Sequence, residues 1–244
     1  PNQRYYWRVA ATDGAYEVRI PNKEGKPVLF GNKRADVSGF KWSDLDGDGD
    51  DDLLIGGGRE GRLVVYRNDG AGGFAEWDQP GIPKSNVRDQ TAVVVLKSAE
   101  GQPRVVVGSA NWEDARPDAS RFEVFPLGSN AVVADIPVPA GRASTGPVVL
   151  ADVDGDGDLD LFVGARVTAD GYPEKADSVL FGNDGGQFTE RQRFPALALV
   201  SGAVFTDYDG DGDPDLVLAC EWDSLRRLRN DGGKFSDATA GSGL

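Results

Sequence analysis

The sequence predicts an all-β protein built from repeated four-stranded antiparallel units. An aspartate-rich loop occurs three times with identical spacing. Each copy lies between short apolar segments of strand length, and each is followed by a turn that contains glycine. Short strands separated by regular turn signals are typical of an all-β domain. At 244 residues the chain is long enough to bury a sizeable core.

The aspartate-rich loops begin at Asp44, Asp152 and Asp207. Each has carboxylates at positions 1, 3, 5 and 9, and glycines at positions 4 and 6. Carboxylates so close together repel one another strongly unless a cation lies among them. Hard oxygen ligands in this number suit Ca²⁺ better than Mg²⁺, which requires a strict octahedron and keeps its waters. The loops therefore predict three bound calcium ions.

These loops differ from an EF-hand, which needs a bidentate Glu at position 12 and a following helix. Position 12 is Ile55, Val163 or Leu218 here. The residues after each loop form a short apolar run that is typical of a buried strand. Each loop is thus expected to join two strands.

A fourth, degenerate copy is predicted from the spacing. The second and third loops start 55 residues apart, whereas the first and second start 108 residues apart, close to twice that spacing. Residues 91–96 and 105–108 supply the expected apolar runs. The ligand positions between them hold Leu96, Ser98, Glu100 and Arg104, so we expect no cation there and a positive charge from Arg104 in its place.

Four strands can be assigned to each unit. The first precedes the loop (39–42, 147–150, 203–205), and the second is the apolar run after it. The third is expected at 63–66, 122–125, 178–181 and 225–228, and the fourth opens at Phe74, Phe188 or Phe235. Asn-Asp-Gly turns at 68–70, 183–185 and 230–232 join the third and fourth strands, because these residues accept positive φ. Units of 50 to 60 residues with four antiparallel strands predict β-propeller blades.

Composition narrows the function classes. The formal net charge is −14, much of it in the three loops, and nothing basic enough for nucleic acid remains. The sequence contains no run of 18 apolar residues, so it predicts no membrane span. The chain contains no histidine, which excludes histidine-based catalysis and histidine-bound zinc, and its single cysteine, Cys220, is expected in the core. Because the sequence starts at Pro1, we expect it to be a piece of a longer protein.

The pattern Asp-x-Asp-Gly-Asp-Gly-x-x-Asp-Leu, with a later Asn-Asp-Gly-Gly-x-Phe, resembles the FG-GAP/VCBS repeats of integrin α-subunit propellers and secreted bacterial proteins. The resemblance covers about residues 36–244. It implies a loop between the first and second strands of a blade, which binds Ca²⁺ through the side chains at positions 1, 3, 5 and 9 and the carbonyl at position 7. The implied ligands are Asp44, Asp46, Asp48, Asp50 and Asp52; Asp152, Asp154, Asp156, Asp158 and Asp160; and Asp207, Asp209, Asp211, Asp213 and Asp215.

The predicted blades span residues 36–86, 87–142, 143–198 and 199–244. Residues 1–35 are expected to be the outer strands of a preceding blade or a connecting segment, or alternatively the end of a fibronectin type III domain. The resemblance implies a ring of seven or eight blades, so the chain is expected to be part of a larger propeller. A closed five-bladed ring is the alternative.

The sequence predicts an extracellular, cell-surface or periplasmic module that recognises a protein or a glycan, because such calcium loops suit the millimolar Ca²⁺ outside cells. Connections between second and third strands lie on the edge opposite the loops, and there Trp112, Arg116, Tyr172 and Trp222 are the candidate ligand-binding residues. Packing of Trp112 and Trp222 between blades is an equal alternative. A calcium-dependent polysaccharide lyase is the competing function, but the base and cations that such chemistry needs are not evident.

Overall fold

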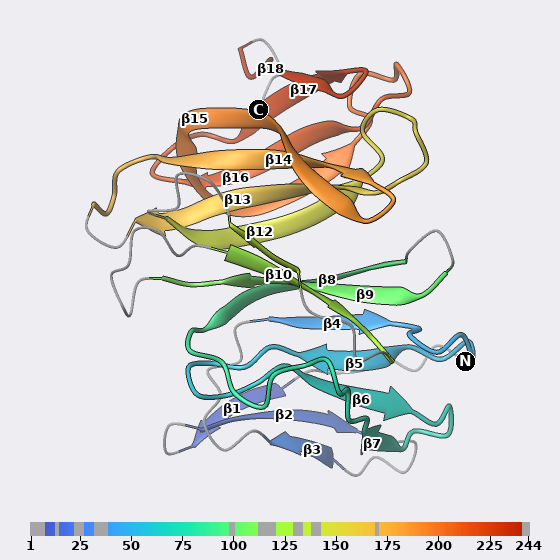
Figure 1. The fold of residues 1–244 in the computed structure, drawn as a ribbon. Helices are drawn as coiled ribbons and strands as arrows, with labels where there is room; N and C mark the ends of the chain where they lie inside the picture. The colour runs from blue at the N-terminus through green and yellow to red at the C-terminus, as the bar shows by residue number, and fades with distance from the viewer. Residues whose placement is uncertain are drawn as a thin grey trace.

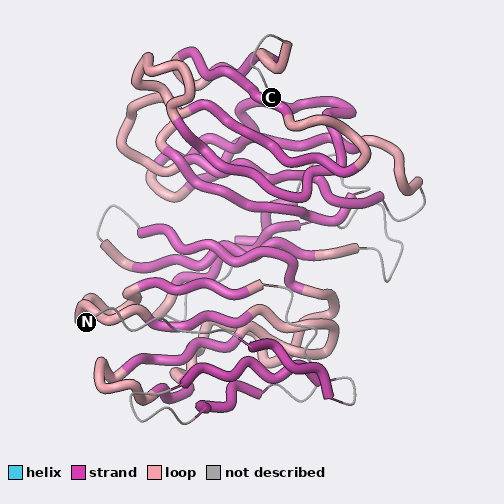
Figure 2. Tube along the Cα trace, turned by 180° about the vertical axis from the view of Figure 1, so that it is seen from behind, coloured by secondary structure: helices cyan, strands magenta, loops and turns pink. Residues whose placement is uncertain are grey.

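The computed structural model of the chain is all-β in the part that it describes, which comprises residues 8–12, 15–21, 27–31, 39–97, 101–111, 121–128, 134–137, 143–168 and 171–240. Figure 2 shows strands and loops, and no helix, in these segments. All strand pairs are antiparallel. The part of the fold prediction that specifies an all-β protein with antiparallel sheets is thereby confirmed.

The strands form four sheets, in which neighbouring strands follow the order of the chain. The first sheet contains β1 (Arg8–Thr12), β2 (Ala15–Pro21) and β3 (Pro27–Gly31). The second contains β4 (Phe40–Ser43), β5 (Asp52–Ile55), β6 (Val64–Asn68) and β7 (Phe74–Glu76). The third contains β8 (Gln90–Lys97), β9 (Pro103–Ser109), β10 (Arg121–Pro126) and β11 (Ala134–Pro137).

The fourth sheet has seven strands because one long strand belongs to two units. Its members are β12 (Ala143–Ala151), β13 (Asp160–Thr168), β14 (Ala176–Asp184), β15 (Gln187–Thr206), β16 (Asp215–Glu221), β17 (Arg226–Asp231) and β18 (Lys234–Asp237). The first part of β15 pairs with β14 and its second part pairs with β16. β15 thus serves as the fourth strand of one unit and the first strand of the next.

The sheets lie one above another, from the first sheet at the bottom of Figure 1 to β18 at the top. The two end sheets lie at opposite ends of this stack in both views, and the described strands do not close a ring. The expected propeller closure is therefore not seen within this part of the chain.

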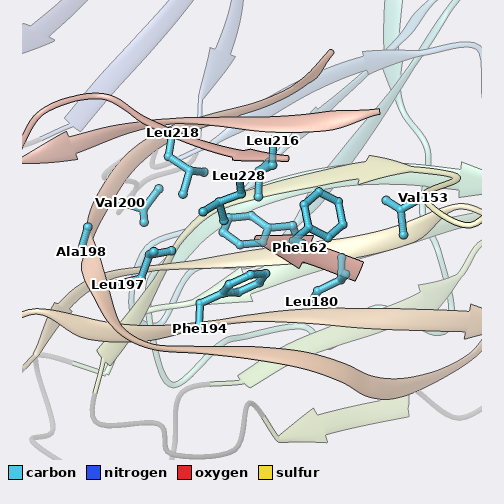
Figure 3. Close-up of a cluster of buried hydrophobic side chains, with 11 residues drawn as sticks. Val153, Phe162, Leu180, Phe194, Leu197, Ala198, Val200, Leu216, Leu218 and Leu228 are labelled. Carbon is cyan, nitrogen blue, oxygen red and sulfur yellow. The ribbon is translucent and has the colours of Figure 1, made fainter. Parts of the chain in front are cut away.

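Apolar side chains fill the spaces between the second and third sheets, between the third and fourth sheets, and between the two units of the fourth sheet. In the middle strands, neighbouring residues point to opposite faces: Leu161 packs toward the third sheet, and Phe162 packs into the cluster shared with β16 and β17. Figure 3 shows this second cluster, with Phe162, Phe194 and Leu218 among its members. Burial of both faces explains why the second strand of each unit is a continuous apolar run rather than an alternating one.

Two of the three predicted hairpin turns lie one residue further along than the sequence predicts, and the turn predicted at 68–70 is a longer loop, because Asn68 pairs with Phe74. Asp184 pairs with Gln187, so the two central residues of the turn are Gly185 and Gly186, with φ of 57° and 92°. Gly232 and Gly233 repeat this arrangement with φ of 57° and 86°. A two-residue turn with positive φ at both positions matches the twist of the strands, and glycine adopts it without strain.

Candidate functional site

The three aspartate-rich loops connect β4 to β5, β12 to β13 and β15 to β16, which are the first and second strands of three units. Each brings three carboxylates together, with one oxygen from each lying within 4.8 Å of the others. The groups are Asp44, Asp46 and Asp48; Asp152, Asp154 and Asp160; and Asp207, Asp209 and Asp211. The loops therefore contain three acidic groups that could hold metal ions.

The carboxylate at position 1 holds the loop in its tight curve. Asp152 accepts hydrogen bonds from the backbone nitrogens of Gly155 and Gly157, at 2.8 and 3.0 Å, and Asp44 and Asp207 accept the corresponding pairs. The glycines at positions 4 and 6 have positive φ in all three loops. The conformation thus turns successive carboxylates toward one another, which explains the fixed glycine spacing.

The carboxylate at position 9 is fully buried in every loop. Asp160 accepts hydrogen bonds from the backbone nitrogens of Val153 (3.1 Å) and Asn183 (2.9 Å). Asp52 and Asp215 are held in the same way. Position 9 thus ties the loop to the third strand of its own sheet.

Burial raises the pKa of Asp52 and of Asp160, and the two backbone hydrogen bonds only partly oppose this shift. For Asp52 the neighbouring charges of Asp46 and Asp48 raise the pKa further. A buried carboxylate beside other carboxylates is an environment that a bound cation would stabilise.

Arginine side chains contact all three acidic groups, which the sequence analysis missed. Arg67 Nε lies 2.5 Å from Asp46, Arg191 pairs with Asp154, and Arg227 Nη2 lies 2.9 Å from Asp209. The ion pair with Arg191 lowers the pKa of Asp154. Arg67 directly precedes an Asn-Asp-Gly turn, and Arg229, which lies 3.0 Å from Asp209, directly precedes another, so this position is a signal that the sequence carries. Arg191 and Arg227 lie outside the motif.

The side chain at position 7 has a second role that the sequence did not reveal. Asp158 accepts a hydrogen bond from the backbone nitrogen of Gly185 at 2.8 Å, and Asp213 accepts one from Gly232 at 2.9 Å. The position-7 side chain therefore fixes the hairpin between the third and fourth strands. Participation of its carbonyl in metal binding stays a prediction.

In the degenerate unit, the observed contact of Arg104 differs from the predicted one, which was a positive charge in place of the cation. Ser98 and Glu100 lie outside the described residues, and Leu96 is buried in the core. Arg104 Nη1 extends into the next unit and donates to the carbonyl of Gly186 at 3.4 Å. The residue therefore links neighbouring units through a hairpin.

We expect Arg104→Ala to lower the free energy of unfolding by about 0.5–1.5 kcal/mol, the usual net contribution of one hydrogen bond. Urea denaturation of the variant beside wild type measures this, and Arg59→Ala, at an exposed position, is the control. A loss above about 3 kcal/mol would indicate instead that Arg104 compensates a buried charge.

The four candidate ligand-binding residues fall into two groups. Trp112 and Arg116 lie outside the described residues. Tyr172 follows β13 and Trp222 follows β16, and their side chains meet: Trp222 Nε1 donates to the Tyr172 hydroxyl at 2.7 Å. Their exposed fractions are 54% and 80%, so Trp222 does not pack between the described sheets.

A cavity of about 270 Å³ lies on the side of the acidic loops. Leu45, Asp46, Trp77 and Leu127 are among its lining residues, together with Pro103 from the degenerate unit. It is a hollow between the second and third sheets, away from the edge that carries Tyr172 and Trp222.

The comparisons with known proteins agree with this arrangement. A family model described as an FG-GAP-like repeat matches residues 44–96 and 152–218, which include the three acidic loops. The chain therefore carries FG-GAP-like repeats in two regions, as the sequence pattern indicated. Curated proteins gave no significant match. In the described segments, no helix has the length and apolar character needed to cross a membrane.

Proposed function

We propose that the chain is part of a calcium-stabilised β-propeller that recognises a ligand outside the cell. The observation that carries the proposal is the threefold repetition of one loop, in which three carboxylates converge and the position-9 carboxylate is buried at the start of the second strand. The bound metal ions would stabilise the fold, and the edge of the sheets opposite the aspartate-rich loops would bind the ligand.

The donor set fits calcium. The aspartates at positions 1, 3, 5 and 9 of each loop would hold one ion, with the carbonyl of Asp50, Asp158 or Asp213 as a further ligand. All of these donors are hard oxygens, and the described groups contain neither cysteine nor histidine, which favours Ca²⁺ over zinc. When bound, the ion neutralises carboxylates that otherwise repel one another.

Each four-stranded sheet has the strand order of a propeller blade, and FG-GAP-like repeats are associated with such blades. Because the described sheets form an open stack, we propose that further blades of the parent protein complete the ring, rather than five blades within this chain. The first sheet would then belong to the preceding blade.

Loops of this type match the millimolar calcium concentration outside cells. The second-to-third-strand connections emerge on the edge opposite the loops, because successive strands are antiparallel. We therefore propose that this edge contacts a protein or glycan, as an adhesion module does. A polysaccharide lyase is less well supported, because the described cations beside Trp222 already pair with carboxylates.

Calcium titration tests the proposal directly. Isothermal titration calorimetry should give three bound Ca²⁺ per chain, and Asp152→Ala should reduce the number to two. Asp78→Ala, which removes an exposed carboxylate outside the loops, should leave it at three. A chain that binds no Ca²⁺, or that binds Mg²⁺ equally well, would contradict the proposal.

A further inference from the structure

We propose that Trp222 and Tyr172 form a binding platform for a neutral saccharide. The inference rests on the proposed recognition function. It names the class of ligand that would bind at the edge formed by the second-to-third-strand connections. The two side chains come from neighbouring units, Tyr172 from the β13–β14 connection and Trp222 from the β16–β17 connection. Their 2.7 Å hydrogen bond fixes the indole relative to the phenol while the rings stay in solvent.

The backbone of Trp222 supports a role other than packing. Its φ is 57°, in the left-handed region that a bulky residue rarely adopts and that glycine adopts freely. With 80% of its surface exposed, the side chain gains little from burial that could offset this strain. Backbone strain of this kind is concentrated at binding sites, where it positions a side chain for its ligand.

The described cations around the platform are paired with carboxylates. Arg166 Nη1 lies 2.5 Å from Glu221, and Asp223 accepts from Lys175 at 2.7 Å and from Arg226 at 2.8 Å. These cations are therefore already neutralised, so a polyanion would gain little from them. Arg226 and Lys175 hold the pKa of Asp223 well below its usual range, so this carboxylate stays an acceptor at neutral pH.

A neutral sugar ring matches these features. One face of a pyranose presents C–H groups, which pack against an aromatic ring, and its edge presents hydroxyls, which pair with carboxylates and guanidinium groups. A protein partner fits less well, because stable interfaces need a larger apolar centre. In the described parts of these two connections, the exposed large hydrophobic residues are Tyr172, Trp222 and Leu225.

The test measures binding of the calcium-loaded chain to neutral hexasaccharides of the cello, xylo, manno and galacto series, with oligogalacturonate and oligomannuronate as acidic comparators. We expect at least one neutral saccharide to bind in calorimetric titration. Trp222→Gly should weaken that binding at least about tenfold. Its Tm should be equal to or above that of wild type, because glycine relieves the positive φ.

Tyr172→Phe keeps the ring but removes the hydrogen bond to the indole, so it should weaken binding by about two- to tenfold. Val87→Ala is the matched control, since Val87 is an equally exposed apolar residue in the β7–β8 connection. It should leave binding unchanged.

Three results would overturn the inference: no saccharide binding by a chain that holds its calcium, binding of the acidic saccharides alone, or a Trp222→Gly variant that melts early with unchanged affinity. The first leaves the calcium-stabilised module standing. A chain that fails to bind calcium would instead contradict the proposed function itself.

Discussion

Chelation of calcium should lower the Tm of the protein by well over 10 °C. A ligand that binds only the folded state stabilises it by about 2.7 kcal/mol when its free concentration is 100 times Kd, so three equal sites would contribute about 8 kcal/mol. For a chain of this size, 1 kcal/mol corresponds to about 2–4 °C. The buried carboxylates Asp52, Asp160 and Asp215 make the loss large, because without the ion they lie beside other carboxylates in a desolvated position.

The measurement compares circular dichroism melting curves in about 1 mM Ca²⁺ and in excess EDTA, with Mg²⁺ in place of Ca²⁺ as the control for ionic strength and charge. Restoring Ca²⁺ after chelation should restore the original Tm. Melting curves that coincide in Ca²⁺ and in EDTA would show that the loops are ordinary acidic turns.

Phe122→Ala should reduce the free energy of unfolding by about 3–5 kcal/mol, the usual loss for a buried phenylalanine. Phe122 lies on β10 with no exposed surface, and its ring packs edge-on against Phe181 and Phe188 of the next sheet, with centroid distances of 5.0 and 5.9 Å. The substitution would open a cavity between two sheets whose contact is apolar.

Urea denaturation measures this loss, and Phe122→Leu, which keeps most of the volume, should lose less than about 2 kcal/mol. Calcium stoichiometry should stay at three in both variants, because Phe122 does not contact an acidic loop. A loss below about 1 kcal/mol for Phe122→Ala would indicate that the two sheets do not depend on each other for stability.

The second strand of each unit was predictable because its signal lies in consecutive residues of the sequence. An apolar run after each loop has to be buried, and β5, β9, β13 and β16 lie where those runs do. The continuity of β15 was not predictable. Pro195 lies inside it and suggests a break, but the strand bends at Ala196, with φ of 44°, and continues.

The acidic groups were predictable for the same reason, since their members are neighbours in the sequence. Partners such as Arg191 were not predictable, because only the tertiary structure brings them to an acidic group. Arg191 reaches Asp154 from β15, 37 residues away, and no motif includes it. The contact between Tyr172 and Trp222 spans 50 residues and two units, so the sequence indicated both residues but not their pairing.

The shared strand β15 also determines how this part of the molecule would bear load. A tether or adhesive contact that pulls on one of the last two units acts along a backbone that is hydrogen-bonded to β14 on one stretch and to β16 on the next. No flexible linker between these units can stretch first. A load directed along β15 would act in shear on both rows of hydrogen bonds, and the two units would respond as one mechanical element.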